Sequence, residues 1–434
     1  MCEGNIHELP ITEPITELEE PFPHKSYILD NSGNLIFSEI SVDDFQPAID
    51  CAECHQSHYE EWSRSLHANS ITNSFFRNCL EDIKNELGEN SEKLCLQCHD
   101  PINIIAQTDS SINFSQSAIS CDVCHSITKL SSGTITHPSQ LVTSELFLNP
   151  GEGIKYGPKE DSEPNTYHES QYNPIFNQSD ICLPCHDLRK ENLEVEITFT
   201  EWNRIPGMAM SGAFPCQQCH MPEREDGTHE HHFAGVDLSY EVPPEEDPQY
   251  QDVLNLVQTS ATLSFANLMG PLQDSILRDS LINFPIRIES NTGHHLPSGA
   301  SFNRECWLSV EIRSENSSGL ILYENGVLDH DLQLLNYFDP ELTFFTSFLL
   351  TEVGDTTQDI IKAINIINYS LPGMNQRYTE YQVNINENIN QIWIQAKLLF
   401  RPIKPFIFDD YPELKENIPI YTIDSVTKII QIID

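Results

Sequence analysis

The chain has 434 residues, of which 39% are hydrophobic, so it is long enough for two or three domains with a modest apolar core. It carries 66 acidic and 23 basic side chains, which gives a formal net charge of −43. This charge excludes nucleic acid as a partner, opposes binding of the protein body to an anionic membrane, and favours redox partners with basic docking surfaces.

Residues 1–24 form an acidic, proline-rich segment without an apolar period, which is typical of a linker. The segment begins with Met1 and Cys2. One interpretation is a bacterial lipoprotein whose signal peptide has been removed, so that a lipid on Cys2 would be the protein's membrane contact; the alternative is that Cys2 is incidental. Residues 27–40 then predict two short strands around a turn at 31–33.

Five copies of Cys-x-x-Cys-His follow between residues 51 and 220. This pattern is the attachment signature of c-type haem, because two thiols add to the two vinyl groups of one porphyrin while the adjacent histidine reaches the iron. Zinc or redox Cys-x-x-Cys sites are the alternative, but they need no histidine at the fifth position. We therefore expect five covalently bound haem c groups. The predicted attachment cysteines are Cys51, Cys54, Cys95, Cys98, Cys121, Cys124, Cys182, Cys185, Cys216 and Cys219. The predicted proximal ligands of the iron are His55, His99, His125, His186 and His220.

Local structure around the motifs is expected to be short helices and irregular loops. Residues 59–87 carry the clearest helical pattern, and residues 130–180, rich in Pro, Gly, Ser and Asn, are expected to be a loop that wraps haem faces. At this density of motifs, neighbouring haems are expected to lie in contact, an arrangement that conducts electrons. Covalent haem attachment also implies export, so we expect a periplasmic or cell-surface protein, either free or lipid-anchored to the outer membrane.

The composition changes after about residue 240. A run of prolines and acidic residues at 243–248 resembles a linker, and several later segments alternate between apolar and polar residues. Such alternation predicts an antiparallel β-sandwich. The alternating segments are 283–290, 306–314 and 392–400. The expected fold class is therefore mixed: a mainly helical and irregular five-haem module followed by a β-sandwich. The expected divisions are a linker at 1–24, a haem domain at 25–240 and a β-domain at 241–434.

Residues 51–70 (CAECHQSHYEEWSRSLHANS) resemble the opening of the cytochrome c554-like multihaem family, in which Trp-x-x-Ser-x-His follows the first haem. The resemblance implies that His67 is a distal ligand. Residues 156–172 are similar to a family segment whose histidine caps a haem, which implies His168. Residues 216–235 resemble a closing CxxCH-Met-Pro segment, which implies His231, with His229 and His232 as competitors.

Residues 291–312 are similar to a Gly-His-x-Leu-Pro-[Ser/Thr]-Gly segment in the C-terminal β-domain of related multihaem proteins, which implies His294 as a further distal ligand. The fifth distal ligand is unmarked: His137 is the nearest candidate, and a five-coordinate iron is the alternative. His58 is expected to face outward. Two leftover thiols, Cys79 and Cys306, are expected to be isolated.

Three functions fit these features. The first is an electron carrier at the bacterial cell envelope, with mostly bis-histidine haems whose second imidazole saturates the iron. The second is a reductase of a nitrogen or sulfur oxyanion, which needs one open iron; the pentahaem nitrite reductases use a CxxCK motif, whereas all five motifs here end in histidine. The third is a subunit of an extracellular cytochrome filament or another oligomer.

Overall fold

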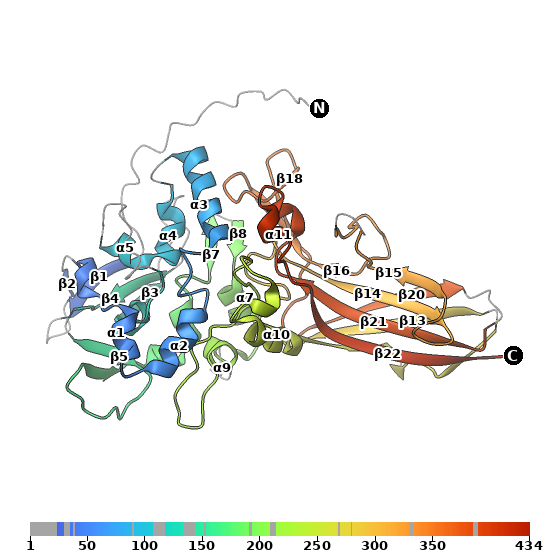
Figure 1. Cartoon of the computed structure of the whole chain (residues 1–434), viewed down its shortest axis with the longest axis horizontal. Coiled ribbons are helices and arrows are strands. Elements are labelled where there is room, and N and C mark those ends of the chain that lie inside the picture. The colour runs from blue at the N-terminus through green and yellow to red at the C-terminus, as the bar shows by residue number, and fades with distance from the viewer. Residues whose placement is uncertain are drawn as a thin grey trace.

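The computed structural model describes most of the chain after the N-terminal segment. The described residues are 24–29, 35–37, 40–88, 91–106, 118–132, 144–151, 153–190, 193–208, 214–267, 270–278, 280–329, 333–384 and 389–434. The predictions made for Cys2 and His137 lie outside them. Two parts are visible in Figure 1: a module of short helices and small sheets, and an elongated β-domain that ends at the C-terminus.

The N-terminal module is built from short helices, most of which carry or flank a Cys-x-x-Cys-His motif. A helical turn suits the motif, because side chains three and four residues apart lie on one face and so both sulfurs and the imidazole point the same way. The helices are α1 (Ala48–Ala52), α2 (Gln56–Arg64), α3 (Ser74–Leu87), α4 (Lys93–His99), α5 (Pro101–Ile105), α6 (Cys121–His125), α7 (Thr198–Arg204) and α9 (Cys216–His220).

The helical pattern of residues 59–87 is interrupted. Helix α2 ends at Arg64, and α3 begins only at Ser74, where the side chain of Asn73 accepts a hydrogen bond from the backbone N–H of Phe76. An asparagine in this position is a strong helix N-cap, and it explains where α3 starts. His67 therefore lies on a turn between the two helices and not within a helix.

The stretch expected to be loop contains strands. A four-stranded sheet has the order β2-β1-β4-β3, and two small pairs, β5 with β6 and β7 with β8, follow. The described residues of this module form only small apolar clusters, such as the one around Phe45, Ile102 and Leu148. The strands are β1 (His24–Leu29), β2 (Leu35–Phe37), β3 (Ile127–Ser132), β4 (Ser144–Leu148), β5 (Ile154–Gly157), β6 (Glu169–Tyr172), β7 (Leu188–Lys190) and β8 (Leu193–Glu196).

The β-domain contains the sandwich that the alternating segments predict. A six-stranded sheet has the order β12-β22-β21-β14-β15, with β16 also paired to β14, and a three-stranded sheet has the order β20-β13-β9. All of these pairings are antiparallel except that of β12 with β22, which is parallel. The strands are β9 (Ala261–Ser264), β12 (Ser275–Leu277), β13 (Leu281–Ser290), β14 (Glu305–Ser314), β15 (Ile321–Asn325), β16 (Phe344–Phe345), β20 (Gln376–Asn384), β21 (Gln391–Arg401) and β22 (Tyr421–Ile433).

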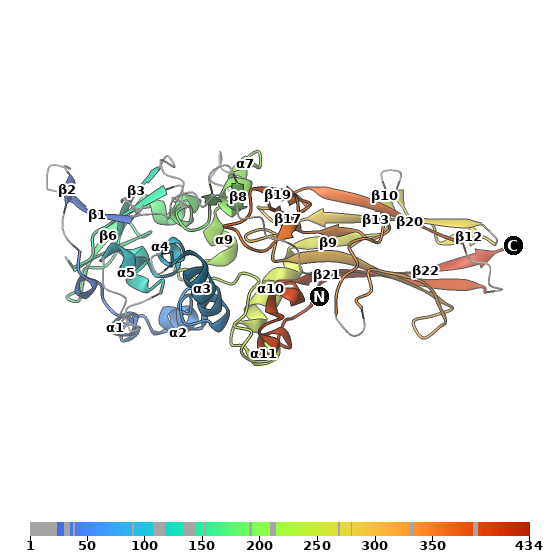
Figure 2. The same cartoon turned by 90° about the horizontal axis from the view of Figure 1, so that it is seen from above.

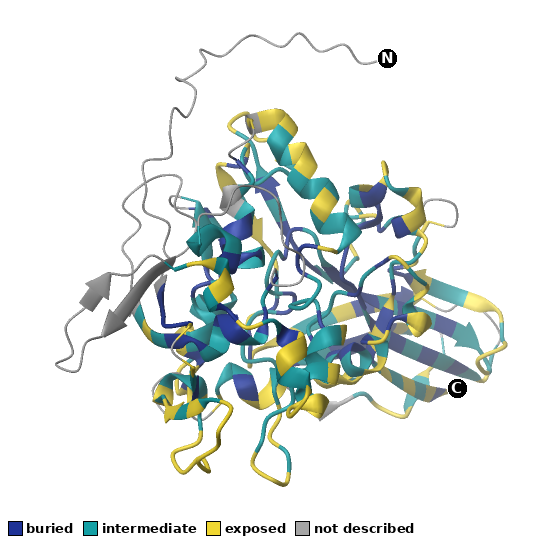
Figure 3. Cartoon of the chain, turned by 60° about the vertical axis from the view of Figure 1, so that its left-hand side comes forward, coloured by how far each residue is buried: buried dark blue, intermediate teal, exposed yellow. Residues whose placement is uncertain are grey.

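The main hydrophobic core lies between these two sheets. Alternate residues of β21, from Ile392 to Phe400, are almost fully buried, and the alternation of buried and accessible positions is visible along the strands in Figure 3. Smaller elements complete the domain and its border with the N-terminal module, as the view from above shows (Figure 2). They are α10 (Tyr250–Thr259), β10 (Ala266–Asn267), β11 (Gly270–Pro271), β17 (Ser347–Leu350), β18 (Thr356–Thr357), β19 (Asn365–Asn368) and α11 (Pro412–Lys415).

Helix α10 differs from the sequence-based prediction, in which residues 241–434 form a β-sandwich domain. Its Val253 and Val257 are buried in the main core, and the helix packs against β22. Within the described part of the chain, no helix is both long and apolar enough to cross a membrane.

Candidate haem centres

The structure brings a second histidine to face four of the five attachment histidines. An imidazole nitrogen binds a transition metal at about 2.0–2.1 Å, and the ring centre lies about 1.1 Å further out, so two imidazoles on opposite sides of one metal have centres about 6.2–6.4 Å apart. The ring centres of four pairs lie at this separation: His55 with His168 at 6.3 Å, His186 with His67 at 6.3 Å, His125 with His231 at 6.4 Å, and His220 with His294 at 6.3 Å.

Hydrogen bonds to backbone carbonyls fix the orientation of six imidazoles, of which five belong to these pairs and the sixth is the attachment histidine His99. In each case the Nδ1 atom lies within hydrogen-bond distance of a carbonyl oxygen, which leaves Nε2 as the atom that can bind iron. Attachment histidines with this contact are His99 to Ser70 at 3.3 Å, His125 to Tyr156 at 2.7 Å and His220 to Ala234 at 2.7 Å. The facing histidines with this contact are His168 to Glu169 at 3.2 Å, His231 to His229 at 2.9 Å and His294 to His295 at 2.9 Å.

Burial keeps several of the rings neutral. Loss of solvation lowers the pKa of His67 and of His231 to about 3, and that of His99 and His220 to about 4. An imidazole must be unprotonated to bind a metal, so these four side chains are held in the ligand form at any physiological pH. The donor set therefore fits iron in chemistry as well as in spacing.

His99 differs from the other attachment histidines. Its ring contact in the described part of the chain is with Phe76, whose ring is stacked on the imidazole at 4.1 Å and 13°. The described histidines give it no partner at the separation seen in the four pairs. His137, which the sequence suggests for the remaining distal position, lies outside the described residues.

The structure distinguishes His231 from its two competitors. His229 directs Nδ1 to the backbone oxygen of Met221 at 2.7 Å, and His232 has Nδ1 3.2 Å from a carboxylate oxygen of Asp252. Only His231 of the three faces an attachment histidine. It faces His125 of the third motif rather than the nearby fifth motif, a pairing that the sequence resemblance did not specify.

His58 does not face outward as expected. It is half-buried between the first and third histidine pairs, with its ring centre 5.9 Å from that of His55 and 4.8 Å from that of His231. Its Nε2 lies 3.3 Å from a guanidinium nitrogen of Arg224. Burial is the main cause that lowers the pKa of His58, and the positive charge of Arg224 adds to it. Local spacing gave no signal for this position, because the Arg224 loop arrives from far along the chain.

Contacts between cysteines of different motifs show which centres are neighbours. The thiols, which stand where thioethers would be after haem attachment, form hydrogen-bonded pairs. Cys51 of the first motif contacts Cys121 of the third, Cys98 of the second contacts Cys185 of the fourth, and Cys182 of the fourth contacts Cys216 of the fifth. The ring of Phe233 lies 4.5 Å from His67 and 5.6 Å from His231, between the third and fourth centres. The five motifs therefore form one connected set.

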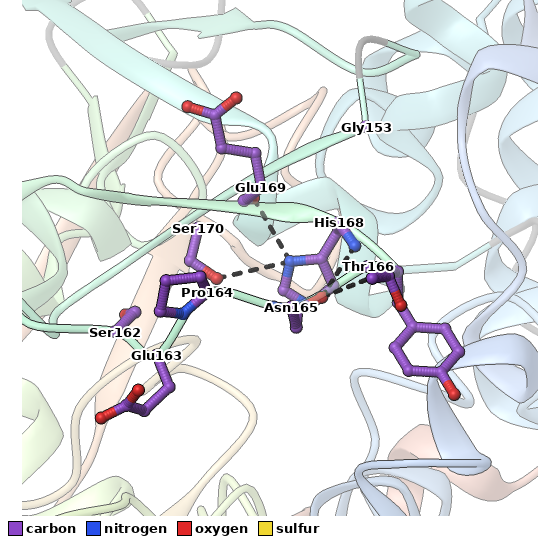
Figure 4. Close-up of a pocket in the computed structure, with 10 residues that line it drawn as sticks. Gly153, Ser162, Glu163, Pro164, Asn165, Thr166, His168, Glu169 and Ser170 are labelled. Atoms are coloured by element: carbon purple, nitrogen blue, oxygen red, sulfur yellow. Dashed lines mark hydrogen bonds between the residues drawn. The ribbon is translucent and has the colours of Figure 1, made fainter.

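The loop that carries His168 is largely exposed to solvent. It borders a cavity of about 530 Å³ lined by Gly153 and residues 162–170, with His168 held by the backbone around it (Figure 4). Asn165 accepts hydrogen bonds from the backbone N–H groups of Tyr167 and His168, both at 3.0 Å, which shapes the turn before the histidine. This side of the first centre is accessible to solvent.

Two tryptophans lie beside the haem motifs, and two thiols of the described residues lie outside them. The indole of Trp62 donates to the backbone oxygen of Ile119 at 2.8 Å, and that of Trp202 to Phe214 at 2.8 Å, so both tryptophans tie together segments that flank motifs. Cys79 and Cys306 are free thiols, and Cys306 is fully buried in the β-domain.

Comparison with known proteins agrees with this geometry. Residues 50–126 match the family described as cytochrome c554 and c-prime. The crystal structure of a penta-haem cytochrome c552 from Thermochromatium tepidum is similar to this chain with a TM-score of 0.64 and 19% sequence identity, over 90% of this chain and 99% of that one. The fold is that of a penta-haem c-type cytochrome.

A second structural match is too weak to indicate a shared fold. A match to the sporulation control protein Spo0M from Bacillus subtilis has a TM-score of only 0.14 at 6% identity, over 40% of this chain and 50% of that one. No curated protein matches the chain.

The motifs, the family match and the fold together support a multihaem c-type cytochrome with covalently bound haem c, a class of electron-transfer proteins. The β-domain is part of the shared fold, because the similarity covers 90% of this chain and so extends well beyond the N-terminal module.

Proposed function

We propose that this chain holds five haem c groups and carries electrons between redox partners at the bacterial cell envelope. The observation that carries the proposal is the set of four imidazole pairs whose ring centres lie 6.3–6.4 Å apart, each containing one attachment histidine. When bound, haem c supplies one-electron iron chemistry, and a saturated bis-histidine iron suits electron transfer without bond rearrangement. The chain fixes the imidazoles, keeps them neutral and holds neighbouring centres in contact.

Haem content and ligation test this proposal directly. The pyridine haemochrome spectrum, together with the mass of the intact protein, should give five haems per chain. Low-temperature electron paramagnetic resonance of the oxidised protein should show low-spin iron at four of them. A polypeptide with the mass of bare amino acids would refute haem attachment, and a mainly high-spin spectrum would refute the bis-histidine assignment.

We place the contact with a basic redox partner at the first centre, around His55 and His168. The exposed side chains there include Ile49 and Tyr167, which are 58% and 79% exposed, and the acidic residues Glu53, Glu163 and Glu169. Apolar side chains within an acidic surface suit a partner with a ring of lysines, because opposite charges raise the rate of encounter.

The dependence of the reaction on salt tests this contact. Reduction of a small basic cytochrome should slow as ionic strength rises, since screening shortens the range of attraction. Glu163→Lys should weaken the salt dependence, whereas Glu352→Lys, a matched change at an exposed site on the β-domain, should leave it almost unchanged. Equal effects of both variants would refute a local docking surface.

The proposal also includes export, a periplasmic or cell-surface location and a lipid on Cys2. Mass spectrometry of the membrane-associated protein would test the lipid.

A second function, reduction of a nitrogen or sulfur oxyanion, is favoured by one observation: His99 faces Phe76 rather than a second imidazole among the described residues. Such a reaction needs an open coordination position and groups that stabilise an anion. Adding nitrite or hydroxylamine to the oxidised protein should shift a high-spin signal if this centre is open. Turnover with either compound would establish the reductase, and the absence of both effects would leave the carrier function.

A further inference from the structure

Helix α7 lies where the N-terminal module meets the β-domain (Figure 1). Its residues contact both the segment before the His220 motif and the loop that carries His294. Its Trp202 donates a hydrogen bond from the indole N–H to the backbone oxygen of Phe214, which lies two residues before the Cys216 motif. A Cβ atom at Gly293, the residue before His294, would lie 3.4 Å from Cδ1 of the same indole. One side chain therefore borders both the attachment segment and the loop from the β-domain.

The neighbouring residue, Glu201, binds the His294 loop more directly. Its Oε2 accepts a hydrogen bond from the backbone N–H of His295 at 3.0 Å and another from the hydroxyl of Ser298 at 2.6 Å. Its Oε1 lies 3.1 Å from Nδ1 of His295. Glu201 is only 4% exposed, and a buried carboxylate forms strong charge-assisted hydrogen bonds.

Thr198, one turn earlier on α7, extends this contact. Its hydroxyl lies 2.8 Å from that of Ser298 and accepts a hydrogen bond from the backbone N–H of Gly299 at 3.1 Å. The helix thus holds the segment from residue 295 to residue 299 at three residues, His295, Ser298 and Gly299. All three lie within five positions after His294, so these bonds limit where its imidazole can reach.

The β-domain holds the same loop from the other side. Leu296 and Leu371 exchange backbone hydrogen bonds of 2.8 and 2.9 Å, and Gly373 lies so close that a Cβ there would be 2.5 Å from the backbone oxygen of His294. The loop is therefore fixed relative to the β-domain. The position of this loop relative to the haem module depends on contacts with the module. Glu201, a buried charged residue of α7, makes such contacts.

We infer that Glu201 is a positioning residue that keeps His294 on the iron held by His220. The inference rests on the proposed bis-histidine ligation. Removing the carboxylate leaves the His295 N–H without its acceptor and leaves the Ser298 hydroxyl with only that of Thr198. The loss of an acceptor is costly for a buried donor. The loop then gains freedom, and the imidazole spends more time away from the iron.

Carbon monoxide tests the inference, because it binds a reduced iron only after the distal histidine has left. For Glu201→Ala we expect the rate of carbon monoxide binding at one haem to rise roughly tenfold or more, together with a high-spin signal in the oxidised protein. Glu201→Gln, which keeps one acceptor oxygen, should restore most of the low-spin signal. Ser298→Ala, a milder change that removes one donor, should give a smaller increase. Glu194→Ala removes a carboxylate that binds Arg189 and Arg204 but not this loop, and it should match the wild type.

His294→Gly separates the inference from the function on which it rests. If His294→Gly opens one haem but Glu201→Ala and Ser298→Ala bind carbon monoxide at the wild-type rate, the positioning role is refuted and the ligation stands. If His294→Gly leaves the spectrum unchanged, the ligand assignment itself is refuted. Equal opening in Glu194→Ala and Glu201→Ala would indicate general loosening of this region and would also refute the specific role of Glu201.

Discussion

Replacement of His168 tests the ligand assignment most sharply, because a second histidine lies even nearer to the same attachment histidine. The ring centre of His58 is 5.9 Å from that of His55, whereas that of His168 is 6.3 Å away. The smaller separation does not favour His58, because two imidazoles on one metal have centres about 6.2–6.4 Å apart, and the His55–His168 pair fits this value. The nitrogen contacts also exclude His58: its Nε2 lies 3.3 Å from a guanidinium nitrogen of Arg224 and its Nδ1 lies 3.5 Å from the hydroxyl of Ser57. His168, in contrast, directs Nδ1 to the backbone oxygen of Glu169 and leaves Nε2 available.

His168→Gly should therefore convert one iron to the high-spin state. The described residues supply four imidazole pairs, so losing one pair should remove about a quarter of the low-spin signal. Spin quantitation by electron paramagnetic resonance at low temperature measures this loss, and exogenous imidazole should restore it. His58→Ala is the matched control and should keep the full low-spin signal. The reverse result, with a loss in His58→Ala and none in His168→Gly, would refute the assignment from ring separation and nitrogen contacts.

Three further outcomes follow from other parts of the chain. Gly373→Ala should displace the backbone of His294, since a Cβ would lie 2.5 Å from its oxygen, and should produce high-spin iron at one haem without changing the haem content. Arg401→Ala should lower the free energy of unfolding by about 3–5 kcal/mol in urea titrations, because it leaves the buried carboxylate of Glu305 without its cationic partner and, among the described residues, with only the hydrogen bond from Tyr337. Burial lowers the pKa of Lys404 to about 8, so between pH 8 and about 10.4 the unfolded chain binds more protons than the folded one. The stability of the wild type relative to Lys404→Met should therefore rise with pH across this window, by up to about 1.4 kcal/mol per pH unit, and a flat difference would contradict the buried ammonium.

The attachment half of each centre could be predicted from the sequence because its chemistry is local. Two thiols and an imidazole for one haem lie within five residues, and one helical turn directs them to one face. The distal half could not be derived in this way. His231 faces His125 rather than the adjacent His220, and the proximity of the first and third motifs that allows this appears only in the folded chain. The family resemblance named the facing histidines, but not the iron that each would share.

The same contrast holds for the fold. Strands β14 and β21 could be predicted because each has one face in the sandwich core and alternates accordingly. Helix α10 was missed because the residues around it were interpreted by analogy with the strands, although Val253 and Val257 recur at the spacing of one helical turn. His58 was misplaced for a different reason: its neighbours His231 and Arg224 come from a distant loop, and no local pattern reports them.

The distribution of apolar packing explains why a β-domain accompanies the haem module at all. The largest core lies between the sheets of the β-domain, whereas the described N-terminal residues form only small clusters between the motifs. A module with so little side-chain core depends on its haems and on neighbouring structure for a fixed shape. The loop with His294 links the haem module to the β-domain, because it contacts Leu371 and Gly373 in the β-domain and Glu201 in the module. Loss of the β-domain should therefore change the ligation of the His220 centre before it changes that of the His55 centre, whose facing histidine comes from the module itself.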